Sequence, residues 1–432
     1  MKKYLVNSVW VLLERIIRLV VMFVFFSLIS RELSVFDFGI FSLSQTVFTL
    51  LAGIVVFGFD NVLIKEFSTN SNNEKFFSTA IISRLLLSFF CVLIFCIVIF
   101  FMDYSDTNKF VFIASSLGLF FQIQTIYYSY YQATSSSFII TKTSALALII
   151  SSIIKSIFIY YKLGIVYYAL SFSLDYFFSC LFIYYVSRKN NIKVLFKNFD
   201  CKILKLLFIQ SFPILLSTLI VMIYTRIDQF MIASMLGVED VAKFSVAVRI
   251  SDAYMFIPMA ISVSFLPMVS RDPSGQNIQK YFHLTHFFTF FSGAFVIILS
   301  PIVINYFFGV RYHDSIAVVN IIVFANIISA LGAVSSNILI LRGITYLRIY
   351  RAIAGLVVNI GLNFYCIPKF GILGAAYSSL LSQVIAAWIS NGFSKKTVDC
   401  FYFQSKSLLT FGIPSVAYIY NELRSKRIKD GE

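Results

Sequence analysis

A small set of charged residues lies inside stretches of the sequence that are otherwise apolar enough for lipid. The cations are Arg15, Arg18, Lys155, Arg226 and Arg249, and the acids are Glu14, Asp175, Asp228 and Asp252. A charged side chain near the middle of a bilayer costs at least about 2.5–3.5 kcal/mol, and such residues therefore mark internal ion pairs or a pathway for a charged substrate. Both interpretations are open for this set.

Spacing favours internal pairing for part of the set. Residues three or four apart share a helix face, and two helices joined by a short turn can bring a Lys against an Asp. The predicted pairs are Glu14 with Arg18, Arg249 with Asp252, and, across a hairpin, Lys155 with Asp175.

Two other groupings are harder to neutralise locally. Arg226 and Asp228 are two residues apart and point to different sides of one helix, so each needs a partner elsewhere or water. Arg15 and Arg18 form one cationic stripe that the single Glu14 cannot neutralise. A water-filled cleft with excess arginine on its walls would attract a phosphate-bearing ligand, because guanidinium binds phosphate in bidentate geometry.

The composition identifies the class of protein that must hold these residues. Of 432 residues, 59% are hydrophobic and 13% are charged, and the mean hydropathy is +0.86. A soluble protein carries about 25% charged residues, so the chain is predicted to be an integral membrane protein. The net charge of +15 follows membrane topology rather than a basic module, and we expect no nucleic-acid partner.

Cysteine and histidine give no sign of a metal or cofactor site. The six cysteines contain no CxxC pair and are interpreted as packing thiols. His283 and His286 stand at the start of one apolar stretch without further ligands and are interpreted as interfacial side chains. No cofactor, no metal and no cleavable signal are expected.

The apolar stretches predict an all-α fold with twelve membrane-spanning helices, since about 20 residues cross the hydrocarbon core. The predicted spans are 8–30, 38–59, 79–102, 110–131, 143–161, 164–187, 207–236, 243–269, 282–308, 316–341, 351–367 and 372–393. A further apolar run, 407–420, is short and contains Gly412 and Pro414, so it is expected to be interfacial or re-entrant.

The distribution of basic residues predicts the orientation. Most of the 35 Lys and Arg residues, among them Arg84 and Arg351, fall on the side that also holds the N-terminus. Because positive residues collect in cytoplasmic loops, both termini are expected in the cytoplasm. All loops are short, so no folded extramembrane domain is predicted.

Short matches between the two halves indicate an internal repeat of six helices. "LSVFDFGIFSL" (33–43) matches "LGVEDVAKFSV" (236–246), and "KLGIVYYALS" (162–171) matches "KFGILGAAYS" (369–378). Repeats in the same orientation are related by a pseudo-twofold axis along the membrane normal and enclose a central cleft. The predicted organisation is a lobe at 1–187, a basic linker at 188–206, a second lobe at 207–393 and a cytoplasmic tail at 394–432.

The opening of the chain, "NSVWVLLERIIRLVVMFVFFSLISRELSVFDFGIFSLSQ" (7–45), carries a family pattern. Asn7 and Trp10 are followed by a charged first helix and then by Arg31, Leu33 and the pair Phe38–Gly39, with Ser34 where the family usually has glycine. The pattern resembles Wzx-type polysaccharide-unit flippases of the multidrug/oligosaccharidyl-lipid/polysaccharide (MOP) exporter superfamily. Residues 226–258 and 370–383 resemble later helices of the same family.

The resemblance implies a function and roles for the buried charges. It implies transfer of an undecaprenyl-pyrophosphate-linked oligosaccharide, such as an O-antigen unit, from the inner to the outer leaflet of the bacterial inner membrane. Coupling to an H⁺ or Na⁺ gradient is implied too, with polymerase and chain-length proteins as partners. The candidates are Arg15, Arg18, Lys155, Arg226 and Arg249 for the substrate, and Glu14, Asp175, Asp228 and Asp252 for the ion.

Other functions fit the residues less well. A multidrug or other lipid-linked exporter of the same superfamily is the first alternative, although a drug exporter does not need an arginine-rich cleft. A membrane enzyme of polysaccharide assembly would need large outer loops or an intramembrane histidine site. A channel would need a continuous polar pore. We therefore expect a transporter and not an enzyme.

Overall fold

Helices form all of the regular structure in the part of the chain that is described. The computed structural model describes residues 2–69, 73–190, 192 and 196–418. It divides the chain into two compact units, Met1–Ile223 and Tyr224–Glu432. The division falls inside one long helix, α9 (Cys201–Met235). The predicted all-α architecture is confirmed, while the predicted pseudo-twofold axis, central cleft and lobe boundaries stay predictions.

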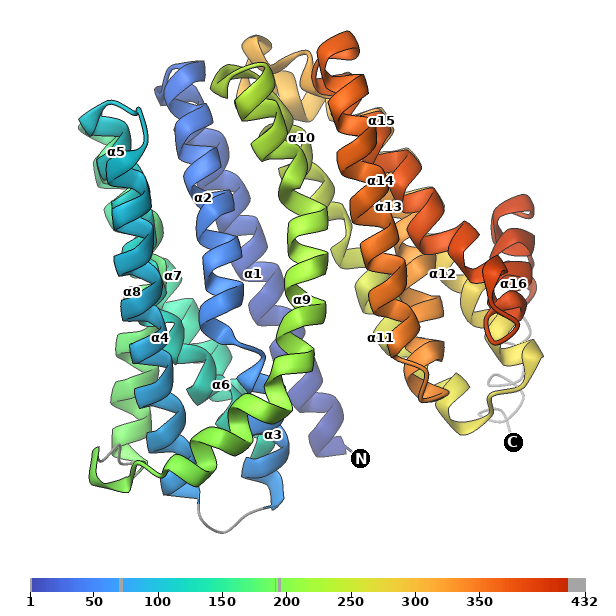
Figure 1. Cartoon of the computed structure of the whole chain (residues 1–432), viewed down its shortest axis with the longest axis horizontal. Helices are drawn as coiled ribbons and strands as arrows, with labels where there is room; N and C mark the ends of the chain where they lie inside the picture. Colours follow the sequence, from blue (N-terminus) through green and yellow to red (C-terminus); the bar gives the residue numbers. More distant parts are fainter. Residues whose placement is uncertain (1, 70–72, 191, 193–195, 419–432) are drawn as a thin grey trace, which may run out of the picture. The chain divides into compact units, whose positions relative to one another are not determined.

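The first unit is a bundle of long helices (Figure 1). Within it α1 packs on α7, α7 on α8, α5 on α8 and α3 on α6. Its helices are α1 (Lys2–Glu32), α2 (Val35–Val56), α3 (Phe59–Thr69), α4 (Asn73–Phe101), α5 (Asp106–Ser116), α6 (Gln124–Ala133), α7 (Phe138–Tyr160), α8 (Ile165–Lys189) and the first part of α9.

The second unit continues from α9 with a comparable set of helices. Here α14 packs on α15, α12 on α13, α10 on α13, and the short α16 on α12. The helices are α10 (Val238–Tyr254), α11 (Phe256–Arg271), α12 (Gly275–Val303), α13 (Ser315–Leu341), α14 (Tyr346–Phe370), α15 (Ile372–Gln383) and α16 (Val398–Leu409). A π-helical stretch, Val384–Trp388, follows α15.

Length and composition support the predicted membrane spans one by one. Eleven helical segments among the described residues are long and apolar enough to cross a membrane, and each coincides with a predicted span from the second to the twelfth. The first span corresponds to α1, which has 31 residues and is therefore long enough to cross. Because Glu14, Arg15 and Arg18 lie near its centre, α1 is not one of the eleven segments that are apolar enough by composition.

Side-chain burial follows the pattern of helices packed in lipid. Large apolar side chains point outward, such as Phe101, which is 80% exposed. Small polar side chains are buried between helices, for example Ser78, Ser88 and Ser144. Small residues let membrane helices approach closely, and lipid chains contact the outer face. Apolar side chains outside and small polar side chains inside therefore agree with a membrane environment.

The second predicted span, 38–59, corresponds to α2, and the backbone changes direction at its end. Helix α2 ends at Val56 because Phe57 and Gly58 both adopt positive φ angles, 53° and 72°, and α3 begins at Phe59. The Phe57 N–H donates to the Gly53 carbonyl at 3.2 Å, which caps the end of α2. Glycine at position 58 tolerates this backbone conformation without strain.

Gly374 sets the closest approach of two helices in the second unit. A Cβ atom added there would lie 2.1 Å from the carbonyl oxygen of Cys366, so α14 and α15 touch through their backbones. We expect Gly374→Ala to lower the free energy of unfolding by about 1–3 kcal/mol, because the helices must move apart. Thermal unfolding in detergent checks this. Gly361→Ala in α14 is the matched control, because no atom lies near its added Cβ, and equal losses in both variants would contradict the prediction.

The segment after the twelfth span is folded onto α12 with its polar residues inward. Gln404 and Ser407 are completely buried, whereas Leu409 is 81% exposed. Gln279 of α12 donates from Nε2 to the Ser407 hydroxyl at 3.1 Å. Gly412, at a φ of 68°, lies so close to α12 that an added Cβ would be 2.5 Å from the His283 carbonyl oxygen. The end of the predicted 407–420 run, from residue 419 on, lies outside the described residues.

Candidate functional site

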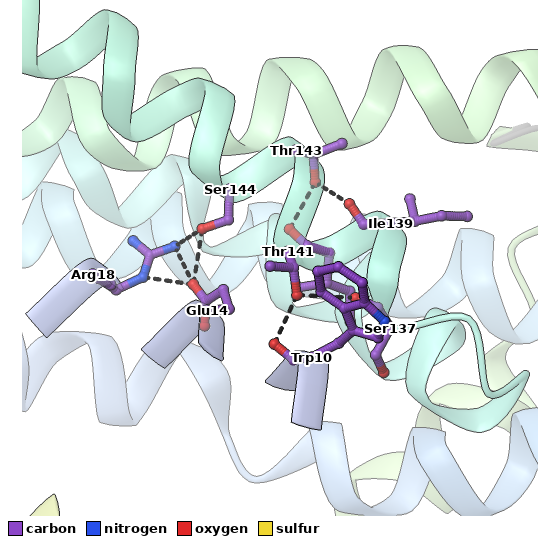
Figure 2. A network of polar contacts seen from close by, with 9 residues as sticks. Trp10, Glu14, Arg18, Ser137, Ile139, Thr141, Thr143 and Ser144 are labelled. Atoms are coloured by element: carbon purple, nitrogen blue, oxygen red, sulfur yellow. Dashed lines mark hydrogen bonds and ion pairs between the residues drawn. The ribbon is translucent and has the colours of Figure 1, made fainter. Parts of the chain in front are cut away.

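Glu14 and Arg18 form an ion pair on α1 that is completed by a hydroxyl from α7 (Figure 2). Arg18 donates from Nε to Glu14 Oε1 at 2.8 Å and from Nη2 to Ser144 Oγ at 2.6 Å. Ser144 in turn donates to the same Glu14 oxygen at 2.8 Å. One turn earlier, Thr141 Oγ1 donates to the Trp10 carbonyl at 2.8 Å and also ties α7 to α1. The predicted pairing of Glu14 with Arg18 is confirmed.

Arg15 differs from Arg18 in its surroundings. Its side chain is exposed, and among the described residues it has no hydrogen-bond or ion-pair partner. Since Glu14 is engaged by Arg18, the stripe keeps one uncompensated positive charge inside a membrane span. This is the cation excess that the spacing predicted.

Lys155 and Asp175 form a buried ion pair between α7 and α8. Lys155 Nζ donates to Asp175 Oδ2, and the exposures of the two side chains are only 6% and 3%. The ammonium also lies 5.4 Å from the centre of the Phe25 ring. The predicted contact across the hairpin is confirmed, and its burial favours a structural role for both residues over a role in contacting a ligand.

Arg226 and Asp252 pair between α9 and α10. Arg226 Nη2 donates to Asp252 Oδ2 at 2.9 Å, and the pair is partly exposed. The sequence predicted that Asp252 pairs with Arg249 on the same helix. The contact of Asp252 with Arg226, on a different helix, was not predicted. Arg249 is half-buried in α10 and has an interaction of its own.

Asp228 lies in a buried cluster of oxygen and amide groups from three helices. Its carboxylate is 3% exposed. Oδ1 accepts from Asn363 Nδ2 of α14 at 2.6 Å, and Oδ2 accepts from the Ser379 hydroxyl of α15. Asn363 Nδ2 also donates to Asn359 Oδ1 at 3.1 Å. No Lys, Arg or His pairs with Asp228 within the described part of the chain.

This cluster could hold a proton or a small hard cation. A buried ionised carboxylate without a counter-charge is costly, so the group gains from taking up a proton or a cation. Hard cations prefer oxygen ligands, which Asp228, Asn359 and Ser379 offer. Asn363 Oδ1 is buried and lacks a hydrogen-bond partner among the described residues, which leaves a further oxygen for the same purpose.

The sequence interpretation missed Asn359 and Asn363, although a signal was present. The two amides are four residues apart and therefore share one face of α14, within a predicted span. Two large polar side chains on one face of a membrane helix indicate a polar partner elsewhere in the fold. That partner is Asp228.

Two arginines counted on the predicted cytoplasmic side, Arg84 and Arg351, lie in helices that match the predicted spans 79–102 and 351–367. Arg84 is completely buried in α4 and donates to the Val56 carbonyl at 2.8 Å, where α2 ends. Arg351 is buried in α14 and donates to the Ala386 carbonyl at 3.0 Å, within the π-helical stretch. Both arginines satisfy carbonyl groups that lose their regular partner where a helix breaks or widens.

The two histidines, predicted to lie at the membrane interface, are buried inside the protein. His283 and His286 are 1% and 2% exposed. His283 lies 2.9 Å from Gln279 Nε2 and 3.2 Å from Ser407 Oγ, so it joins α12 to α16. Among the described residues no cluster of three or more His, Cys, Asp or Glu side chains could hold a metal ion.

Comparison with known proteins identifies the family. Residues 3–272 match the family described as polysaccharide biosynthesis protein. The chain belongs to this family. The match covers the whole first unit and continues through α10 and α11.

Curated relatives agree with this placement in the polysaccharide biosynthesis protein family. A putative O-antigen transporter of Shigella flexneri is 24% identical over 215 residues, which are 48% of this chain and 51% of the relative. The capsular polysaccharide biosynthesis protein CapF of Staphylococcus aureus is 23% identical over 339 residues, 75% of this chain and 84% of the relative. The alignment thus spans about half the length of the Shigella protein.

Solved structures show that this family member has a MOP transporter fold. The lipid II flippase MurJ, in an inward closed conformation, superposes with a TM-score of 0.75 at 18% identity and covers 96% of this chain and 93% of its own. An inward-facing MATE family multidrug transporter of the MOP superfamily has a TM-score of 0.63 at 17% identity, covering 91% and 94%. The resemblance noted in the sequence is confirmed, and these neighbours are transporters rather than enzymes.

Proposed function

We propose that this protein moves an undecaprenyl-pyrophosphate-linked oligosaccharide from the cytoplasmic to the periplasmic leaflet of the bacterial inner membrane. One observation carries the proposal: the Arg15–Arg18 stripe on α1 keeps an excess positive charge inside a membrane span. An arginine exposed at that depth needs an anionic partner or water. A pyrophosphate headgroup supplies that partner in bidentate geometry.

Membership of a polysaccharide biosynthesis family supports the same substrate class. The named Shigella relative is a putative O-antigen transporter. The basic residues retained on the predicted inner side support cytoplasmic termini. We include coupling to H⁺ or Na⁺ in the proposal, with Asp228 as the ion-binding residue.

The experiment is transport in vesicles of defined lipid. The protein is reconstituted with an undecaprenyl-pyrophosphate oligosaccharide that carries a fluorophore on its sugar, and an impermeant reductant measures the fraction in the outer leaflet. Arg18→Ala and Arg15→Ala are each expected to slow transfer by about 10–100-fold, because one lost charged hydrogen bond is worth about 1.5–3 kcal/mol. Arg188→Ala is the control, since this exposed arginine at the end of α8 donates, within the described part of the chain, only to Tyr184.

Glu14→Gln separates a substrate role from a purely structural one. If the ion pair only holds α1 against α7, Glu14→Gln and Arg18→Ala should both slow transfer. If Arg18 binds the pyrophosphate, removal of the Glu14 charge leaves more positive charge for the ligand, and we expect substrate affinity to stay equal or rise. Normal transfer by both arginine-to-alanine variants would contradict the proposal.

A multidrug exporter is the competing function, because MATE transporters share the fold. The same vesicles loaded with a cationic dye distinguish the two. Dye export without transfer of the labelled lipid would favour the multidrug function.

A further inference from the structure

An apolar groove lies between α1 and α7 in the first unit. Its volume is about 910 Å³, and its wall on α1 is formed by Ile17 and Val21. On α7 it is lined by apolar side chains such as Ile149 and Ile153. None of its lining residues is charged, so it suits a hydrocarbon chain.

Small residues of α7 leave this space open. Ala145, Ser152 and Ser156 line the groove, where larger side chains would fill it. The lining continues to Tyr160, and the helix from Ala145 to Tyr160 is about 22 Å long, a large part of the roughly 30 Å hydrocarbon thickness. The groove is therefore long and narrow rather than a compact pocket.

One end of the groove meets the charged cluster of Figure 2. Val21 and Leu148 line the groove and are three residues from Arg18 and four from Ser144, so each pair shares a helix face. Arg15 is two residues from Ile17 and points to a different side of α1. The groove and cluster together match an amphiphile that has one apolar chain and an anionic headgroup.

We propose that this groove binds the isoprenoid chain of the lipid carrier while Arg18 contacts its pyrophosphate, an inference that rests on the proposed function. With the N-terminus in the cytoplasm, the groove runs from the inner part of the membrane to its outer side. The chain of a lipid that enters headgroup-first from the cytoplasmic leaflet points in that direction. The groove thus holds the chain at an early stage of transfer, and Tyr160 and Tyr161 mark its interfacial end.

The test is photo-crosslinking of a polyprenyl phosphate that carries a diazirine on its isoprenoid chain. In the reconstituted wild-type protein, crosslinks are expected on α1 around Ile17 and on α7 around Ser152. Undecaprenyl pyrophosphate should compete for them, and an excess of phosphatidylglycerol should not. Equal competition by the phospholipid would show an ordinary lipid-filled surface and overturn the proposal.

A second experiment uses variants in which a larger side chain fills the groove. Ser152→Trp is expected to lower crosslinking at least about tenfold, because the indole occupies the space of the chain. Leu146→Trp is the matched control, since Leu146 is exposed on α7 outside the groove. If Ser152→Trp does not fold, Ser156→Phe fills the same space. Unchanged crosslinking in a folded filled variant would overturn the proposal.

Transport distinguishes failure of this inference from failure of the proposed function. If the wild type and the filled variant move the labelled lipid equally fast, the groove proposal is wrong and the flippase function stands. If the wild type crosslinks the probe specifically but moves no labelled lipid, the groove binds the chain and the proposed function is wrong.

Discussion

Asp228→Asn is expected to reduce gradient-driven transport to the level of protein-free vesicles while leaving the fold intact. The carboxylate is buried and has hydrogen bonds from Asn363 and Ser379 but no cation among the described residues. An uptake of H⁺ or Na⁺ would relieve the cost of that buried charge. An amide at this position keeps hydrogen-bonding capacity but has no charge to exchange, so the coupling step is lost.

The measurement is transport of the labelled lipid under an imposed proton or sodium gradient, together with binding of radioactive sodium. Asp314→Asn is the control, because Asp314 is an exposed carboxylate of the same unit that pairs with Lys243 at 2.8 Å. Asn363→Ala should weaken coupling less than Asp228→Asn, since it removes one neighbour and not the charge. Gradient-driven transport that is unchanged in Asp228→Asn would exclude Asp228 as the coupling residue.

Removing one member of the Lys155–Asp175 pair is expected to lower the free energy of unfolding by about 3–5 kcal/mol, because the remaining charge is then buried without a partner. Both side chains are almost fully buried between α7 and α8. Lys155→Met and Asp175→Leu should each reduce the temperature of unfolding in detergent and the amount of protein in the membrane.

The double variant decides the role of this pair. Replacing both charges with apolar side chains of similar size leaves no unpaired charge, so stability should return close to the wild-type value. Normal lipid transfer by the double variant would assign the pair to packing alone. If stability returns but transfer does not, Lys155 or Asp175 takes part in transport.

The local features of this fold were predictable from sequence. Long apolar runs identify the spans, because hydropathy depends on composition along a single helix. The Glu14–Arg18 pair follows from helical spacing, and the Lys155–Asp175 pair follows from two neighbouring helices joined by a short turn. Each of these contacts depends on residues that are close in sequence or on adjacent helices.

Contacts between distant helices were not predictable. Asp228 meets Asn363, 135 residues later, and no spacing rule links the two. The break at Phe57–Gly58 falls near the predicted end of the second span at residue 59, because the polar residues of α3 follow it. The partners of Arg84 also lie on other helices, because its guanidinium donates to the Val56 carbonyl and pairs with Asp60 of α3 at 3.0 Å.

The polarity of the C-terminal segment determines where the membrane domain ends. Gln279 and His283 of α12 are hydrogen-bonded by this segment, while Leu409 points away from the protein. A protein shortened to residue 397 would lose the Phe403 and Ser407 partners of that amide and imidazole, which would keep only their contact with each other among the hydrogen bonds of the described residues. Residues 398–418 therefore pack on α12 as part of the helical bundle, in addition to the twelve predicted spans. Affinity tags or fusion partners are best attached beyond them.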